Sequence, residues 1–64
     1  MDEWTGVLIG KMHNARVTYN DLGEELGVGK AYVCMVLNCR RRPEGAQERF
    51  ESAFERILEK RGSA

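Results

Sequence analysis

The sequence predicts an all-α fold, a single compact domain of four helices, or five, over residues 1–64. No segment alternates apolar and polar residues for long enough to form a strand, and glycines and one proline divide the chain into four segments with helical periodicity. So short a chain has room for one small core and not for a deep pocket that excludes water. We therefore expect no enzyme, no cofactor and no small-molecule ligand.

A first helix is expected over residues 2–14. Its apolar face repeats every four residues and consists of Trp4, Val7, Leu8 and Met12. We expect Trp4 to anchor the core, and Asp2 and Glu3 to stabilise the positive end of the helix dipole.

A second helix is expected over residues 19–26, because Thr18 and Asp21 form the pattern of a capping box. Gly27 ends this helix, since glycine adopts the left-handed conformation without steric cost. The apolar residues expected to be buried around it are Val17, Leu22 and Leu26.

A third helix is expected from Gly29 or Lys30 to Leu37 or Asn38. Its buried face consists of Val33, Val36 and Leu37. The opposite side carries Lys30, Ala31, Cys34 and Met35, with Tyr32 at the margin. Because the connection to the second helix is short and contains glycine, the two helices should cross at a steep angle.

A fourth helix is expected over residues 43–60, with Pro43 at its first position and Gly62 ending it. Its core face consists of Phe50, Ala53, Phe54, Ile57 and Leu58. A second face carries the five acids Glu44, Glu48, Glu51, Glu55 and Glu59. We interpret this acidic stripe as a solvated surface; the alternative is a docking site for a basic partner.

The charges are unevenly distributed, although ten basic and ten acidic residues give a formal net charge of zero. Residues 28–43 carry four cations and no acid, and three of these cations are the consecutive Arg40, Arg41 and Arg42. Taken alone, this run fits a solvated loop as well as a surface that binds phosphates.

Cys34 and Cys39 are expected to be free thiols, because two cysteines do not make a disulfide framework. With His13 they supply at most three ligands and lack the paired spacing of zinc sites, so no metal site is expected. No apolar run approaches the ~20 residues that span a bilayer, and the acidic start is unlike a secretory signal. These features predict a cytoplasmic protein without membrane contact.

Residues 19–38 resemble the helix-turn-helix of the phage Cro and lambdoid repressor family, also called the xenobiotic-response-element type of regulator. Gly23 stands where the family requires a small residue, and Gly27 stands at the family's turn glycine. Apolar residues occupy the five positions at which the family packs its two helices, Leu22, Leu26, Val28, Val33 and Val36. The run Leu37-Asn38, followed by residues 40–43, is similar to the family's common sequence after the second of these helices.

The resemblance implies a lambda-repressor-like domain that binds double-stranded DNA and regulates transcription, as phage or prophage repressors do. Residues 29–38 would enter the major groove, which admits one helix. The residues implied to face base edges are Lys30, Ala31, Cys34 and Met35. Those implied to contact the DNA backbone are Thr18, Tyr19, Gly29, Tyr32, Asn38, Arg40, Arg41 and Arg42. A homodimer is also implied, with the last helix near Phe54 and Leu58 as its candidate interface.

Three departures from the family pattern bear on these expectations. Gly29 stands where serine or threonine often caps the recognition helix. Cys39 replaces a common glycine, so either Asn38 adopts the left-handed turn or Cys39 is strained. Of the residues implied to face base edges, only Lys30 is a good donor to guanine, so we expect few direct contacts that read the base sequence. The alternative function is a helix-turn-helix module that binds another regulatory protein.

Overall fold

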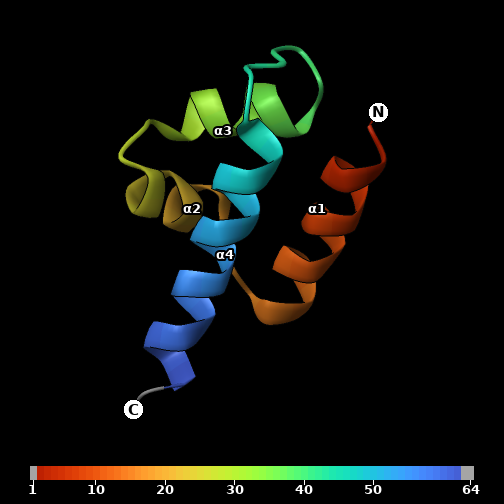
Figure 1. Cartoon of the computed structure of the whole chain (residues 1–64). Coiled ribbons are helices and arrows are strands. Elements are labelled where there is room, and N and C mark those ends of the chain that lie inside the picture. Colours follow the sequence, from red (N-terminus) through yellow and green to blue (C-terminus); the bar gives the residue numbers. More distant parts are fainter. Residues whose placement is uncertain (1, 63–64) are drawn as a thin grey trace.

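The computed structural model describes residues 2–62 as four α-helices joined by short turns. They are α1 (Glu3–Ala15), α2 (Tyr19–Leu26), α3 (Lys30–Leu37) and α4 (Ala46–Gly62), and the described residues contain no strand. Helix α2 packs against α3 and α4, while α1 packs against α4 and α3 (Figure 1). The expected domain of residues 1–64 includes residues 1, 63 and 64, which lie outside the described part. Across residues 2–62, no helix combines the length and the apolarity needed to cross a membrane.

One hydrophobic core joins the four helices. Its buried residues are Leu8, Met12, Val17, Leu22, Val33, Val36, Leu37, Ala46, Phe50, Ala53, Phe54 and Ile57. Trp4 is half-buried and packs its ring edge-to-face on Phe50, with the ring centroids 6.0 Å apart. The expected role of Trp4 in the core is therefore confirmed, although the indole remains partly accessible.

Helix α1 buries a narrower face than the sequence suggested. Thr5, Leu8 and Met12 are buried, whereas Val7 is 52% exposed, so the expectation that Val7 widens the apolar face was wrong. The physical reason is the packing of α1: Val7 lies at the margin of the contact with α4, next to α4 residues that do not cover it. Thr5 is tolerated in the core because its hydroxyl donates to the carbonyl of Asp2 at 2.7 Å.

The expected capping box begins α2. The hydroxyl of Thr18 accepts from the backbone N–H of Asp21 at 3.0 Å, and the carboxylate of Asp21 accepts from the N–H of Thr18 at 3.0 Å. The backbone N–H of Thr18, and then its side chain, lower the pKa of Asp21. Gly27 ends the helix with a φ of 75°, as expected. This α2 start is therefore set by local sequence.

Val28 was expected in the packing between α2 and α3, but its side chain is 38% exposed. The reason is that its backbone makes the contact: the N–H of Val28 donates to the carbonyl of Gly23 at 2.9 Å and closes the turn. Leu22, Gly23, Val33 and Val36 are buried as expected, whereas Leu26 is half-buried and Gly27 exposed.

The start of α4 differs from the sequence prediction. Residues 43–45 form a turn, in which the N–H of Ala46 donates to the carbonyl of Pro43 at 3.2 Å. Gly45 has a φ of 75°, a left-handed conformation that separates Pro43 from the helix. Pro43 is therefore not the first helical residue, and Glu44 lies before α4 rather than on its acidic face.

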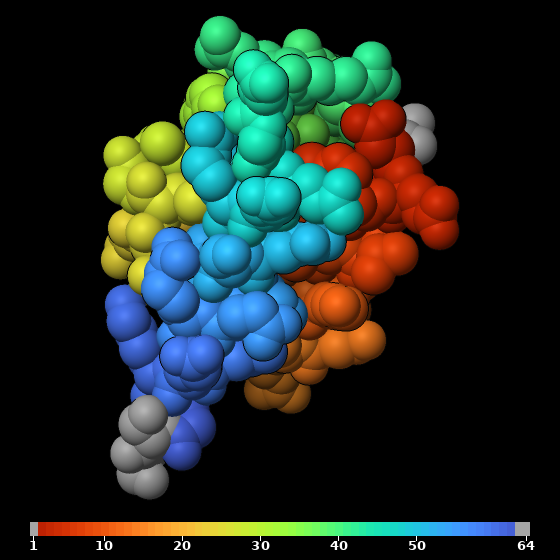
Figure 2. All heavy atoms as spheres, in the orientation of Figure 1, coloured from red at the N-terminus to blue at the C-terminus, as the bar shows by residue number. Residues whose placement is uncertain are grey.

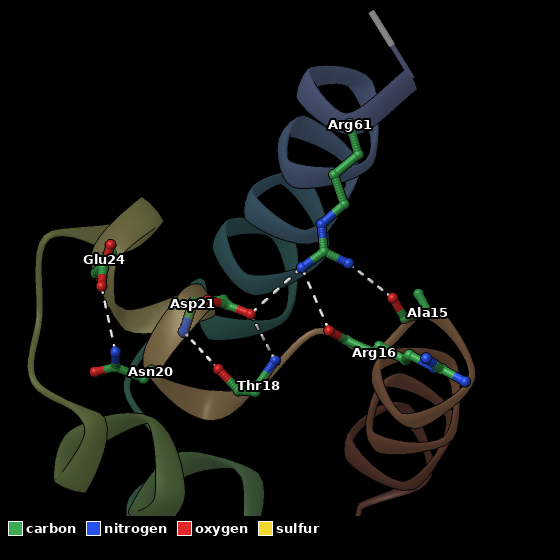
Figure 3. Close-up of polar contacts among 7 residues, drawn as sticks. All are labelled: Ala15, Arg16, Thr18, Asn20, Asp21, Glu24 and Arg61. Carbon is green, nitrogen blue, oxygen red and sulfur yellow. Dashed lines mark hydrogen bonds and ion pairs between the residues drawn. The ribbon is translucent and has the colours of Figure 1, made fainter. Parts of the chain in front are cut away.

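Three basic residues near the end of α4 form hydrogen bonds and ion pairs with the first half of the chain. Arg61 donates to the carbonyls of Ala15 and Arg16 at 2.7 and 3.3 Å, and its guanidinium lies 3.4 Å from the carboxylate of Asp21 (Figure 3). Lys60 and Arg56 pair with Glu25 at 2.7 and 3.0 Å. The hydrogen bond from Lys60, followed by that from Arg56, lowers the pKa of Glu25.

Candidate nucleic-acid interface

The N-terminus of α3 is open to solvent. Gly29 is its N-cap, in an extended conformation with φ −78° and ψ 157°, and offers no side chain to the first backbone N–H groups. Lys30 and Ala31 follow and are exposed. Because the first N–H groups of a helix lack intrahelical partners, this end has free donors next to a cationic side chain.

One turn further along α3, the two other residues expected to face base edges are half-buried. Cys34 and Met35 are both partly covered, and the Nδ2 of Asn38 donates to the carbonyl of Cys34 at 2.8 Å and to its sulfur at 3.3 Å. The Asn38 amide thus caps the C-terminal end of α3. Of the four expected residues, Lys30 and Ala31 are the more accessible.

Residues 40–42, which we call the arginine segment, follow α3 and fold back onto its end. The N–H groups of Arg40 and Arg41 donate to the same carbonyl, that of Met35, at 2.8 and 3.3 Å. The guanidinium of Arg41 lies over the ring of Tyr32, 5.5 Å from its centroid, at a distance typical of a cation–π contact. Arg40 and Arg41 are thereby held beside the helix that carries Lys30.

Arg42 differs from its two neighbours because it has an acidic partner. Its Nε lies 3.3 Å from the Oδ2 of Asp2, and both side chains remain substantially exposed. The negative charge of Asp2 raises the pKa of Arg42. No pattern within residues 28–43 indicated this pair, because its partner comes from the start of the chain.

The last two residues expected to contact the DNA backbone, Thr18 and Tyr19, lie at the start of α2 rather than on α3. The hydroxyl and N–H of Thr18 are both used by the capping box. Tyr19 is half-buried and packs against the hydrophobic core. The site residues therefore fall into one group on α3 and the segment after it, and a second group at the beginning of α2.

Cys39 is the residue whose role sequence patterns left open. It adopts a φ of 61°, so the left-handed turn falls on Cys39, while Asn38 has a φ of −95°. Its sulfur accepts from the N–H of Asp2 at 3.1 Å and lies 3.7 Å from the hydroxyl of Thr5. The N–H of Asp2, and then the Thr5 hydroxyl, lower the pKa of the Cys39 thiol. The thiol thus fastens the turn after α3 to the start of α1.

Metal-binding groups do not gather in residues 2–62, where no cluster of three or more histidine, cysteine, aspartate or glutamate side chains could hold an ion. Comparisons with protein-family models, with curated proteins and with solved structures give no significant match.

Proposed function

We propose that this protein is a sequence-specific regulator of transcription that binds double-stranded DNA, acting as a phage-type repressor does. In this proposal α2 and α3 form a helix-turn-helix, and α3 enters the major groove. The observation that carries it is the fold-back of the arginine segment: Arg40 and Arg41 bond to the Met35 carbonyl, beside a helix whose exposed N-terminus presents Lys30.

The dimensions of α3 suit this role. A helix of eight residues is about 12 Å long, comparable with the width of the major groove. Lys30 and Ala31 would lead into the groove, and the free N–H groups behind Gly29 would lie near a phosphate. Arg40 and Arg41 would contact the DNA backbone at the other end of the helix.

Recognition of sequence by such a surface is limited. Lys30 can donate to guanine, and Ala31 and the accessible part of Met35 can contact thymine methyl groups. Two copies on a two-fold site would add specificity through the spacing of half-sites. Phe54 is 4% exposed and belongs to the monomer's core, so the half-buried Leu58 is the accessible part of the interface suggested on α4.

The proposal is tested by titrating the reduced protein into fluorescently labelled random-sequence duplex DNA at two salt concentrations, followed by sequencing of the bound fraction. We expect anisotropy to rise, the affinity to fall steeply with salt, and a two-fold-related site to be enriched. Reversal of Arg40, Arg41 and Arg42 to glutamate should abolish binding.

The control reverses three cations that lie outside the proposed interface and form no ion pair within residues 2–62, Lys11, Arg16 and Arg49. This variant has the same net charge as the first and should retain sequence preference. If both triple variants bind equally, or if the unaltered protein fails to bind DNA at low salt, the proposal is wrong. The protein-interaction alternative then becomes the leading one.

A further inference from the structure

A shallow groove follows the line along which α1 and α4 pack together, and we refer to it as the α1–α4 groove. It is lined by Val7, Leu8, Lys11, Glu48, Glu51, Ser52, Phe54 and Glu55. A second depression shares Val7 and Glu51 and continues the groove to Glu3, Trp4 and Gln47. In the space-filling view the two helices lie side by side, with α4 forming a ridge beside α1 (Figure 2).

The two walls of the groove differ in chemistry. The α1 wall has an apolar centre, in which Val7 is 52% exposed and is flanked by the half-buried indole of Trp4, between the charged side chains of Glu3 and Lys11. The α4 wall carries the carboxylates of Glu48, Glu51 and Glu55, with Lys11 as the single cation opposite. Apolar side chains in a groove beside a row of charges match the two faces of an amphipathic helix.

These carboxylates are not neutralised by the protein itself. Glu51 accepts a hydrogen bond from Gln47 at 3.3 Å, and no ion pair within residues 2–62 involves Glu48, Glu51 or Glu55. The paired cations of α4 are instead directed away from the groove, Arg56 and Lys60 to Glu25 and Arg61 to Asp21. With Lys11 as its single cation, the groove therefore has a net negative charge.

We propose that the α1–α4 groove is a docking site for a cationic amphipathic helix of a partner protein, whose apolar residues pack on Val7 and Trp4 and whose lysines or arginines meet Glu48, Glu51 and Glu55. Charge complementarity selects this occupant. A second copy pairing through the same groove would place these carboxylates against their own counterparts, and like charges disfavour that arrangement. DNA is repelled for the same reason.

This inference does not rest on DNA binding, because no residue lining the groove belongs to the proposed DNA interface. Val7 was expected to be core, and the acidic stripe was interpreted as a solvated surface with a docking site for a basic partner as the alternative, so the sequence did not join the two in one surface. Their juxtaposition depends on the packing of α1 against α4.

The test uses the full chain and a synthetic helical peptide of about 15 residues with leucines on one face and lysines flanking them. Trp4 is the single tryptophan and lines the groove, so its fluorescence reports occupancy directly. We expect a saturable change with the lysine peptide that weakens with added salt, and none with the same peptide carrying glutamate. Binding of both peptides with equal affinity would overturn the proposal.

Two pairs of variants locate the binding surface. Val7→Ser should weaken peptide binding about tenfold, since the apolar contact is lost, whereas the other exposed valine, changed as Val28→Ser, should leave it unaltered. Glu51→Lys should weaken binding at least threefold, whereas Glu24→Lys, the same charge change on α2, should not. Circular dichroism establishes that the variants are folded, and DNA anisotropy should not distinguish Val7→Ser from the unaltered protein.

Loss of binding that follows net charge alone, with Glu24→Lys as harmful as Glu51→Lys, would mean that the groove is not the site. Sedimentation measures whether the protein forms a dimer through this groove. A dimer that dissociates on introducing Val7→Ser would make a second copy the occupant and contradict the proposed partner.

Discussion

The carbonyl oxygen of Val28 occupies the space next to Gly23 where a side chain would begin. The two residues are joined by a backbone hydrogen bond of 2.9 Å from the Val28 N–H to the Gly23 carbonyl, and a β-carbon on residue 23 would lie 2.8 Å from the Val28 oxygen. In this chain the turn passes so close to α2 that a methyl group has no room.

Gly23→Ala should therefore destabilise the protein by about 1–3 kcal/mol, the usual cost of forcing an extra methyl group into packed structure. Gly10→Ala is the control, because a β-carbon at residue 10 of α1 meets no atom within 4 Å. Because alanine lowers the backbone entropy of the unfolded chain, Gly10→Ala should stabilise the folded protein by about 0.5–1 kcal/mol. Urea denaturation of the two variants measures both effects, and equal shifts in one direction would contradict the close approach.

Replacing Cys39 separates its backbone conformation from its thiol contacts. Cys39→Ala and Cys39→Gly both remove the acceptor of the Asp2 N–H, but only glycine adopts a φ of 61° without strain. We expect Cys39→Gly to be the more stable of the two by about 1 kcal/mol in urea denaturation. Cys39→Ser, which retains an acceptor, should be more stable than Cys39→Ala. An alanine variant as stable as the glycine variant would show that the left-handed turn is not retained.

The ion pairs of Glu25 predict a specific pH dependence. The pKa of Glu25 is lower in the folded protein than the ordinary value of 4.5, because Lys60 and then Arg56 donate to its carboxylate. The stabilisation that these ion pairs give to the folded protein is therefore fully present above pH 4.5, and it is lost as the pH falls through the pKa that Glu25 has in the folded state. Glu25→Gln should lower the urea midpoint at about pH 7, and this difference should shrink at about pH 3.

The exposed Glu24, which accepts from Asn20 at 3.2 Å and has no cationic partner within residues 2–62, provides the comparison (Figure 3). Glu24→Gln should change the midpoint little at either pH. If the effect of Glu25→Gln were the same in acid and at neutral pH, its cause would be packing and not charge.

The pair between Arg42 and Asp2 predicts a variant with stronger DNA binding, provided that the proposed function is correct. Asp2→Asn removes the competing carboxylate, leaving the Arg42 guanidinium available to a phosphate. We expect the affinity for duplex DNA to rise about two- to fivefold at low salt, in keeping with the small energies of exposed ion pairs. Glu3→Gln, an equal change in charge at the neighbouring position, should raise it less. Equal gains would indicate a general charge effect.

Much of the fold was predictable because its signals are local. The capping box at Thr18 and Asp21 and the glycine at residue 27 set both ends of α2, and each acts within a few residues. The start of α4 was mispredicted because proline suits both a first helical position and a turn. The left-handed Gly45 decides between them, and a glycine does not reveal its φ from sequence.

The candidate site was predictable only in outline. Cationic residues and the helix that carries them are evident in the chain, but the partners of Arg42 and Cys39 lie in α1's first turn or just before it. Such contacts join residues more than thirty positions apart and depend on how the helices pack. The exposure of Val7 also depends on how the helices pack. The periodicity of a sequence gives the direction of a side chain, but it does not show whether a neighbouring helix covers that side chain.

The contribution of α4 to the core has a consequence for biosynthesis. Five of its residues, Ala46, Phe50, Ala53, Phe54 and Ile57, are buried, and its final turn holds the α1–α2 junction through Arg61. While the ribosome is still translating α4, the first three helices can pack only against one another, and the core lacks the five residues that α4 contributes. Folding must therefore wait until nearly all of α4 has left the exit tunnel, and the nascent chain up to that point is exposed to chaperones and proteases.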